Sequence, residues 1–187
     1  MRRHVSFLHG HNNRLLNSEV TENDNLRNEY ATLFTHVDKD IPWARIALQQ
    51  QPDAINIWIG NSLSTTALHK DNYENIYVQI LGQKHFILLP PLAYSCVNER
   101  NLPPASYGRT PDGGFELRKE EGESVPFATW DPDFPEDEKK GAKYSQYART
   151  VRVTLGEGDM LYLPALWYHK VSQSCSEEGI CCAVNYW

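Results

Sequence analysis

The sequence has 187 residues, a formal net charge of −6, and a composition of 41% hydrophobic and 22% charged residues. This length is enough for one domain with a full hydrophobic core, and the composition is ordinary for a globular protein. The acidic balance argues against direct nucleic-acid binding, which needs a broad excess of lysine and arginine. No apolar run approaches the roughly 18 residues of a membrane-spanning helix, so we expect no membrane-embedded segment.

The cysteines and the N-terminus bear on the cellular compartment. The four cysteines, at positions 96, 175, 181 and 182, lack zinc-ribbon spacing, and the last two are adjacent in an expected strand. We therefore predict reduced thiols in a cytoplasmic or nuclear protein. The first residues are basic, but polar residues follow within a few positions, so we do not expect a secretory signal.

Residues 1–53 are expected to form an N-terminal strand, at residues 5–8, and a helical support. His4, His9 and His11 surround that strand and fit loop positions better than a metal site. Apolar residues at positions 26, 30 and 33 have helical spacing, and a better helix begins at Pro42 and ends by Pro52. Its expected inner face comprises Trp43, Ile46, Ala47 and Gln50.

From residue 54 onward the pattern changes to β-strands. Strands are expected at 54–59, 76–80 and 85–89, with an extended segment around residue 69, and again at 149–155, 160–163, 167–173 and 180–187. About eight strands in two groups fit a mainly β, double-stranded β-helix, the jelly roll of cupins. We expect a single domain over 1–187, with its barrel formed by residues 54–91 and 148–187.

Residues 92–147 interrupt the barrel between its fourth and fifth strands. This segment contains one Pro-Pro pair, one Gly-Gly pair and a run of charged residues at 118–123. It shows little strand or helix periodicity. Stretches of this length inside a compact domain are usually functional or disordered. We expect a partly ordered insertion that lies over the mouth of the site.

The candidate site begins with His69 and Asp71. Residues two apart in an extended chain point to the same face, so this pair can present an imidazole and a carboxylate to one point. A further imidazole would complete the two-histidine, one-carboxylate set of non-haem iron oxygenases, and His169 is the candidate. Two histidines and a carboxylate also suit zinc, so a zinc hydrolase stays open at this point.

Three neighbouring residues strengthen the pair, which alone is weak evidence. Thr66 is close enough in sequence for its hydroxyl to reach a ligand beside the metal, and Asn75 shares strand parity with the pair. Lys84 opens an apolar strand, and an inward-facing ammonium is costly unless an anion meets it. Each of the three also fits an ordinary surface or strand position, but together they favour a metal centre with a bound carboxylate.

The chain resembles the JmjC domains, the Fe(II)- and 2-oxoglutarate-dependent branch of the cupins. The matching segments are Thr66-x-x-His69-x-Asp71 with Asn75, Gly82-x-Lys84-x-Phe86 leading to Pro90-Pro91, Gly158-Asp159-x-Leu161-Tyr162-x-Pro164 with Trp167-x-His169, and Val184-Asn185-x-Trp187. The resemblance implies that His69, Asp71 and His169 bind Fe(II), and that Lys84 and Thr66 bind the distal carboxylate of 2-oxoglutarate. It further implies that Asn75 and Asn185 line the cosubstrate pocket, that Trp187 walls it, and that O2 is consumed.

The nearest branch of the family is described as lysyl hydroxylases of developmentally regulated GTP-binding proteins. The resemblance therefore implies hydroxylation of a lysine in a protein or peptide substrate, with succinate and CO2 as coproducts. A pocket for that cation would have acidic or aromatic walls, for which we consider Tyr73, Trp130, Asp131 and Asp133. The alternatives are an N-methyl-lysine demethylase, an endopeptidase, for which the sequence offers no nucleophile pair, or a truncated cupin that binds metal without turnover.

The sequence departs from the family pattern in two ways. Related hydroxylases have a tyrosine on an early strand that contacts the oxo-acid, where this chain has Phe7. The pattern also ends at Trp187, whereas family members usually carry helices before and after the barrel, and the later helices often form a dimer interface. The resemblance thus implies a fragment or shortened product, and a homodimer in the full-length form.

Overall fold

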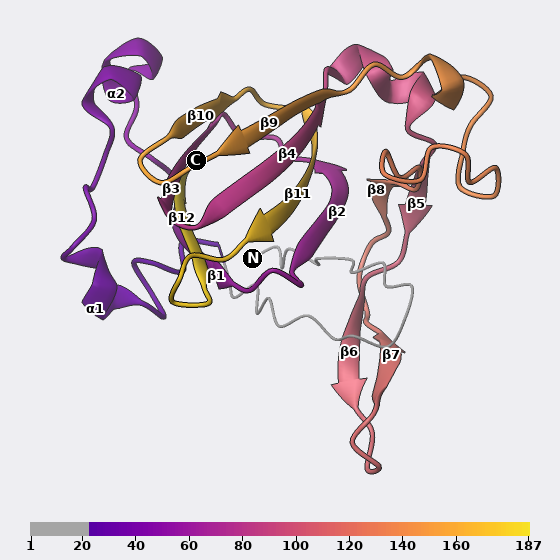
Figure 1. Ribbon diagram of the computed structural model, residues 1–187, viewed down its shortest axis with the longest axis horizontal. Coiled ribbons are helices and arrows are strands. Elements are labelled where there is room, and N and C mark those ends of the chain that lie inside the picture. Colours follow the sequence, from indigo (N-terminus) through magenta and orange to yellow (C-terminus); the bar gives the residue numbers. More distant parts are fainter. Residues whose placement is uncertain (1–22) are drawn as a thin grey trace.

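The fold is a barrel of two facing antiparallel sheets in a computed structural model that describes residues 23–187 (Figure 1). The barrel strands are β1 (Ile55–Gly60), β2 (Thr65–Lys70), β3 (Asn75–Leu81), β4 (Gln83–Leu89), β9 (Val151–Leu155), β10 (Met160–Leu163), β11 (Tyr168–Ser174) and β12 (Cys181–Tyr186). The first sheet has the order β1-β12-β3-β10 and the second β2-β11-β4-β9. The predicted jelly roll, with four strands on each side of an insertion, is confirmed.

The space between the two sheets is filled by inward-facing apolar side chains. They are Tyr77, Phe86, Leu88, Leu155, Leu163, Val171 and Ala183, all buried. The rings of Tyr77 and Phe86 meet edge to face at 5.2 Å, which links β3 of one sheet to β4 of the other. Burying each large side chain contributes roughly 1.5–3 kcal/mol, so this cluster holds the sheets together.

The outer face of the first sheet is covered by the segment that contains α1 (Ala31–Phe34) and α2 (Pro42–Leu48). The expected inner face of α2 is wrong, because Trp43 is 53% and Ile46 69% exposed while Ala44 is buried. The helix has only seven residues and ends at Gln49 with φ 54°, so a single small residue supplies its buried contact. An amphipathic stripe needs a longer helix.

Among the described residues, the edge of β1 is bonded by the segment around Asp24 and Asn25 and not by another strand. Asp24 Oδ1 accepts a hydrogen bond from the backbone N–H of Ile55 at 2.9 Å, and Asn25 Oδ1 accepts one from Ile57 at 2.8 Å. Unpaired strand edges invite association with other chains. These caps therefore protect the edge of the first sheet.

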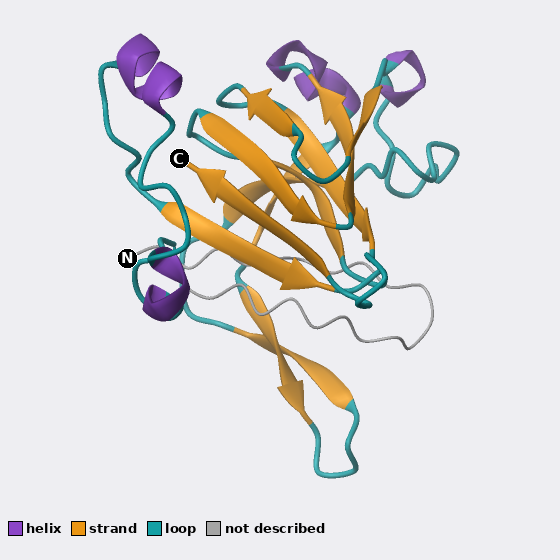
Figure 2. Cartoon of the chain, turned by 60° about the vertical axis from the view of Figure 1, so that its left-hand side comes forward, coloured by secondary structure: helices purple, strands orange, loops and turns teal. Residues whose placement is uncertain are grey.

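The insertion is more ordered than its sequence indicates. It contains η1 (Pro91–Cys96), β5 (Glu99–Leu102), β6 (Ala105–Arg109), β7 (Phe115–Lys119), β8 (Val125–Ala128) and η2 (Ser145–Tyr147). β5 pairs with β8 and β6 with β7, and Figure 2 shows the β6–β7 hairpin projecting from the barrel as an arm. Every residue of β7 is exposed, so the short alternation of Phe115 and Leu117 with charged residues does not correspond to a buried face.

The base of the insertion packs against the outer face of the second sheet. Val97, Ala128 and Trp130 form a buried cluster with residues of β2, β4 and β11, namely Leu68, Leu89 and Tyr168. The insertion therefore covers the back of the sheet whose front faces the barrel interior. Its predicted position over the site mouth is not tested by these contacts and stays a prediction.

Two smaller expectations concern cysteines and membrane segments. All four cysteines are free thiols, as predicted. Within residues 23–187, the helices are too short or too polar to cross a membrane. The expected strand at 5–8, Phe7 and the three histidines near the N-terminus lie outside the described residues.

Candidate metal centre

The three candidate ligands converge at one end of the barrel interior. His69 on β2 lies directly opposite His169 on β11, and their ring centroids are 4.1 Å apart. Asp71 follows β2, and its Oδ2 lies 3.5 Å from His169 Nε2 and 3.9 Å from His69 Nε2. One ligand atom of each residue falls within 4.8 Å of the others. Residues almost a hundred positions apart thus present two nitrogens and a carboxylate to one point.

Both imidazoles are held in the tautomer that a metal requires. His69 Nδ1 lies 2.8 Å from the carbonyl oxygen of Ala67, and His169 Nδ1 lies 3.1 Å from that of Trp167. A carbonyl oxygen only accepts, so each Nδ1 carries the proton and each Nε2 keeps its lone pair. Backbone carbonyls that fix the ring in this way are the usual support of metal-binding histidines.

The loop that carries Asp71 is tied to the loop before β11. The carbonyl oxygen of Asp71 accepts a hydrogen bond from Leu166 N–H at 2.7 Å. Glu74 Oε2 accepts hydrogen bonds from Tyr162 O–H at 2.6 Å and from Ala165 N–H at 3.2 Å. These bonds restrain the carboxylate before any metal binds.

A β-bulge decides which way Thr66 points. Thr66 and His69 differ by three positions, so a regular strand would place them on opposite faces. In the structure His69 pairs with His169, but Thr66 pairs with Val171, so the three-residue step on β2 spans only two residues on β11. The extra residue on β2 turns the Thr66 side chain back to the side on which His69 lies. Thr66 therefore shares the inner face with His69 and with buried Val171.

Lys84 is buried inside the barrel with its charge unmatched. The residue is 7% exposed, and its Nζ lies 6.0 Å from the centre of the Tyr77 ring. Within residues 23–187 its Nζ has neither a hydrogen bond nor an ion pair. Burial lowers the pKa of Lys84 from its ordinary value, an effect that the nearby Cys181 and Cys182 partly oppose. Such an ammonium is suited to receive an anion.

A glycine turn sets the start of β4 and therefore the position of Lys84. Gly82 has φ 69°, and a Cβ at this position would come within 2.5 Å of the carbonyl oxygen of Ser174. Only glycine adopts this tight turn without strain. The turn fixes a register in which Lys84 faces inward with Phe86 and Leu88, as predicted.

The opposite sheet contributes a chain of neutral polar groups. Asn185 Nδ2 donates to Asn75 Oδ1 at 3.0 Å, and Asn185 Oδ1 accepts from Trp58 Nε1 at 2.8 Å. Tyr77, which the sequence reasoning missed, lies between Asn75 and Gln79 on the same inward face and is 7% exposed. Burial raises the pKa of Tyr77, so its hydroxyl stays protonated. Its strand parity with Asn75 was the signal that could have identified it.

Trp187 lies at the edge of this interior rather than in it. Its ring stacks on Tyr73 at 5.2 Å with an interplanar angle of 12°. The stack lines a cavity of about 260 Å³ between α2 and the ends of β3 and β12, which has a mixed apolar and acidic wall. The charged residues of that wall are Asp40, Asp53 and Glu74 together with Arg45, whose Nε lies 2.7 Å from Asp40 Oδ2.

Three of the residues considered for a lysine pocket lie elsewhere. Asp131 Oδ1 and Asp133 Oδ2 bind Nζ of Lys170 at 2.6 and 2.8 Å on the outer face of the second sheet. Trp130 is 3% exposed within the cluster beneath the insertion. The expectation for these three residues is wrong, because an internal lysine already occupies the carboxylates. Tyr73 remains a candidate.

Comparisons with known proteins agree with this geometry. Residues 4–187 match the family of cupin-like domains. The chain is 43% identical to the human bifunctional peptidase and (3S)-lysyl hydroxylase JMJD7, over 87% of the chain and 50% of that protein. It is 38% identical to the Arabidopsis thaliana lysine-specific demethylase JMJ32, and 31% identical to the Dictyostelium discoideum JmjC domain-containing protein E, each over 89% of the chain.

The chain spans about half the length of the curated relatives that it matches. The family match covers both groups of barrel strands and the His-x-Asp segment within the first group. The fold, the ligand geometry and the family match point to one conclusion: this chain belongs to the JmjC oxygenases of the cupin-like family.

Proposed function

We propose that this chain is a Fe(II)- and 2-oxoglutarate-dependent protein hydroxylase that modifies a lysine side chain. The observation that carries the proposal is that His69, Asp71 and His169 converge on one point inside a barrel that also buries the ammonium of Lys84. A site for a metal alone needs no buried cation. A site for a metal together with a dicarboxylate cosubstrate does, and this need argues against a zinc hydrolase.

The residues present fit both groups. His69 Nε2, the Asp71 carboxylate and His169 Nε2 would hold Fe(II), since these donors match its preferred ligand set and their proton-bearing atoms point away. Lys84 would pair with the distal carboxylate of 2-oxoglutarate, and Thr66 would donate a hydrogen bond to the same group. Asn75, Tyr77 and Asn185 would line the pocket from the opposite sheet, and Trp187 would close its edge.

The bound groups supply the oxidation, in which 2-oxoglutarate and O2 convert a substrate C–H to C–OH and leave succinate and CO2. The chain itself binds, orients and excludes water. The apolar cluster of Phe86, Leu88 and Val171 forms the dry floor of the site. A dry, shaped cavity strengthens each charge pair inside it.

A lysine of a protein or peptide is the proposed substrate. The similarity to a (3S)-lysyl hydroxylase supports this class, and a developmentally regulated GTP-binding protein is a specific candidate. The stack of Tyr73 on Trp187, with Asp53 and Glu74 in the cavity wall beside it, suits the approach of a cationic side chain, whereas Asp40 of that wall is already paired with Arg45. Cytoplasmic or nuclear location and a homodimer in a full-length form stay predictions.

The decisive experiment loads the protein anaerobically with Fe(II) and 2-oxoglutarate and then admits O2 with lysine-containing peptides. We expect succinate together with a peptide product heavier by one oxygen, and neither product from Asp71→Ala. Zinc should not replace Fe(II). Peptide fragments in place of an oxygenated peptide would instead indicate a peptidase, the other activity in the name of the human relative.

Demethylation of N-methyl-lysine is the second candidate, because the similarity to a lysine-specific demethylase is comparable. The same oxidation on an N-methyl group gives an unstable carbinolamine that releases formaldehyde. Parallel assays with a lysine peptide and its methylated form separate the two reactions. Formaldehyde from the methylated peptide, without oxygenation of the unmethylated one, would reverse our ranking. Metal uptake with no succinate from either peptide would leave only a binding function.

A further inference from the structure

Three residues that flank the candidate ligands on the outer face of the second sheet, Lys70, Tyr168 and Lys170, bind carboxylates of the insertion. Lys70 lies between His69 and Asp71, and Tyr168 lies beside His169 and directly opposite Lys70. Glu99 of β5 meets both: its Oε1 lies 2.5 Å from Lys70 Nζ and accepts a hydrogen bond from Tyr168 O–H at 2.7 Å. One carboxylate of the insertion thus joins the two strands that carry the ligands.

The cluster around Glu99 is closed and largely buried. Lys70 Nζ donates to Tyr168 O–H at 3.2 Å and lies over the rings of Tyr168 and Tyr94 at 5.1 and 5.7 Å. The side chain of Glu99 is 6% exposed, and Tyr168 is 1% exposed. Removing one partner of such a cluster strands a buried charge.

A second contact repeats the arrangement on the other side of His169. Lys170 Nζ lies 2.6 Å from Asp131 and 2.8 Å from Asp133, and its side chain is 8% exposed. Asp133 is more exposed and also binds Arg152 at 3.1 Å. Both neighbours of His169 in the chain are therefore anchored to the insertion.

β2 needs this anchor more than the other ligand strand. Among residues 23–187 it pairs with β11 alone, at the end of the strand order of its sheet, and the bulge interrupts their ladder between Thr66 and His69. A bulged edge strand is the least constrained part of a sheet. Lys70 faces outward between two residues that face inward. A displacement of its backbone therefore also displaces His69 and Asp71.

We propose that Glu99 is a positioning residue for the metal centre, and that the insertion holds the ligands in binding geometry through Glu99 and, to a smaller extent, Asp131. This inference rests on the proposed metal centre. It assigns the insertion a task at the back of the ligand strands, distinct from any cover over the site mouth.

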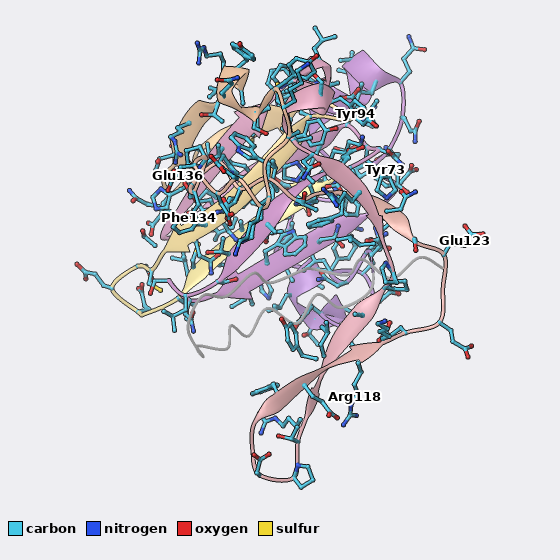
Figure 3. The ribbon with its side chains drawn as sticks, turned by 90° about the vertical axis from the view of Figure 1, so that its right-hand side faces the viewer. Tyr73, Tyr94, Arg118, Glu123, Phe134 and Glu136 are labelled. Carbon is cyan, nitrogen blue, oxygen red and sulfur yellow. The ribbon has the colours of Figure 1, made fainter. Side chains whose placement is uncertain are left out.

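The test compares Co(II) binding and the visible Co(II) spectrum in full-chain variants. Glu99→Gln keeps the length of the side chain but removes the charge opposite Lys70. Glu116→Gln is the matched control, because Glu116 forms an ion pair at 2.7 Å with Arg118 on the projecting arm, away from Tyr94 and the barrel (Figure 3). The control makes the same substitution in the same insertion.

We expect Glu99→Gln to weaken Co(II) affinity by about tenfold and to change the spectrum, as supports of metal ligands do. Glu116→Gln should leave both unchanged. Parental affinity and spectrum in Glu99→Gln, or equal weakening in the control, would overturn the inference. A lower melting temperature without either change would show a structural role alone.

Two further outcomes are misfolding of Glu99→Gln and failure of the parent protein to bind Co(II). If Glu99→Gln does not fold, Tyr168→Phe removes only the hydroxyl that bridges Glu99 and Lys70, and it should weaken Co(II) binding in the same direction. No change in that variant would also overturn the inference. Failure of the parent protein to bind Co(II) would instead contradict the metal centre and the proposed function.

Discussion

The inner faces of the two sheets differ in charge. The second sheet presents His69, His169 and Lys84, with Asp71 at the end of β2, whereas the first sheet presents the neutral Asn75 and Asn185. The Asn185 amide is hydrogen-bonded within the chain through both of its polar atoms: its Nδ2 donates to Asn75, and its Oδ1 accepts from Trp58. The Lys84 ammonium has no such bond among the described residues.

This difference separates the parts of the site that bind from the parts that support. Buried neutral amides cost little when they are hydrogen-bonded, so the first sheet depends less on bound ligands, although Gln79 Oε1 on its inner face has no hydrogen-bond partner among the described residues. A buried cation is costly until a counter-charge arrives, so the second sheet is completed by a metal and an anion. Substitutions on the second sheet should therefore change ligand binding, and those on the first should mainly change stability.

The largest expected effect is loss of the metal from Asp71→Ala. We expect Fe(II) or Co(II) affinity to fall by at least ~100-fold, since removing a ligand exceeds the 10–100-fold cost of removing its support. Calorimetric titration of metal into the apo protein measures this. Retention of parental affinity would place the metal elsewhere.

The next effect concerns the cosubstrate and Lys84. In Lys84→Met we expect 2-oxoglutarate affinity of the Co(II)-loaded protein to fall by about 10–150-fold, the equivalent of a charge-assisted bond worth roughly 1.5–3 kcal/mol. Metal affinity should not change. Lys143→Met removes an exposed lysine as the control. Equal 2-oxoglutarate affinity in Lys84→Met and its parent would separate the oxo-acid from this cation.

The pH dependence of stability tests whether the buried cation of Lys84 destabilises the apo protein. The pKa of Lys84 is lowered in the folded protein by burial, so between its folded and unfolded values the unfolded state binds more protons. The apo protein should become more stable as pH rises through this window, and lose that contribution as pH falls. Lys84→Met removes it, so the variant should gain stability over the parent at the lower pH. Urea unfolding of both proteins across pH measures the difference, and parallel curves would contradict it.

On the first sheet, Asn185→Ala should act mainly on stability. It leaves Asn75 Oδ1 and Trp58 Nε1 without their bond partner, and a buried unsatisfied group costs about 1–3 kcal/mol. We expect the free energy of unfolding to fall by that amount, measured in urea, while Co(II) affinity stays within about threefold of the parent because the ligands lie on the other sheet. A large loss of metal affinity would show that the first sheet also contributes to metal binding.

Local pattern was enough to predict that His69 and Asp71 share a face and that the chain forms a barrel, whereas His169 joins them only through the tertiary fold. His69 and Asp71 obey the two-residue period of a strand, and the eight strands carry hydrophobic runs bounded by turns, so both could be predicted from sequence. The burial of Lys84 followed from its phase with Phe86. These features depend on neighbours in the chain.

Features that depend on distant partners could not be predicted. The inward turn of Thr66 arises from a bulge against β11, and the partner of Asp131 is Lys170, 39 positions away. The short strands of the insertion pair with one another away from the barrel core, and the alternation of Phe115 and Leu117 with charged residues in β7 does not mark a buried face, because the whole strand is exposed. In each case the deciding contact is set by the tertiary fold.

The smallest effect falls on the boundary between the two sheets, at Tyr77. Its ring belongs to the first sheet but lies 6.0 Å from Lys84 Nζ, so its hydroxyl can reach an anion bound there. Tyr77→Phe keeps the packing against Phe86 and removes one neutral hydrogen bond, worth about 1 kcal/mol. We expect roughly fivefold weaker 2-oxoglutarate binding with unchanged metal affinity. Unchanged 2-oxoglutarate binding, measured by titration of the Co(II) form, would confine cosubstrate recognition to the charged sheet.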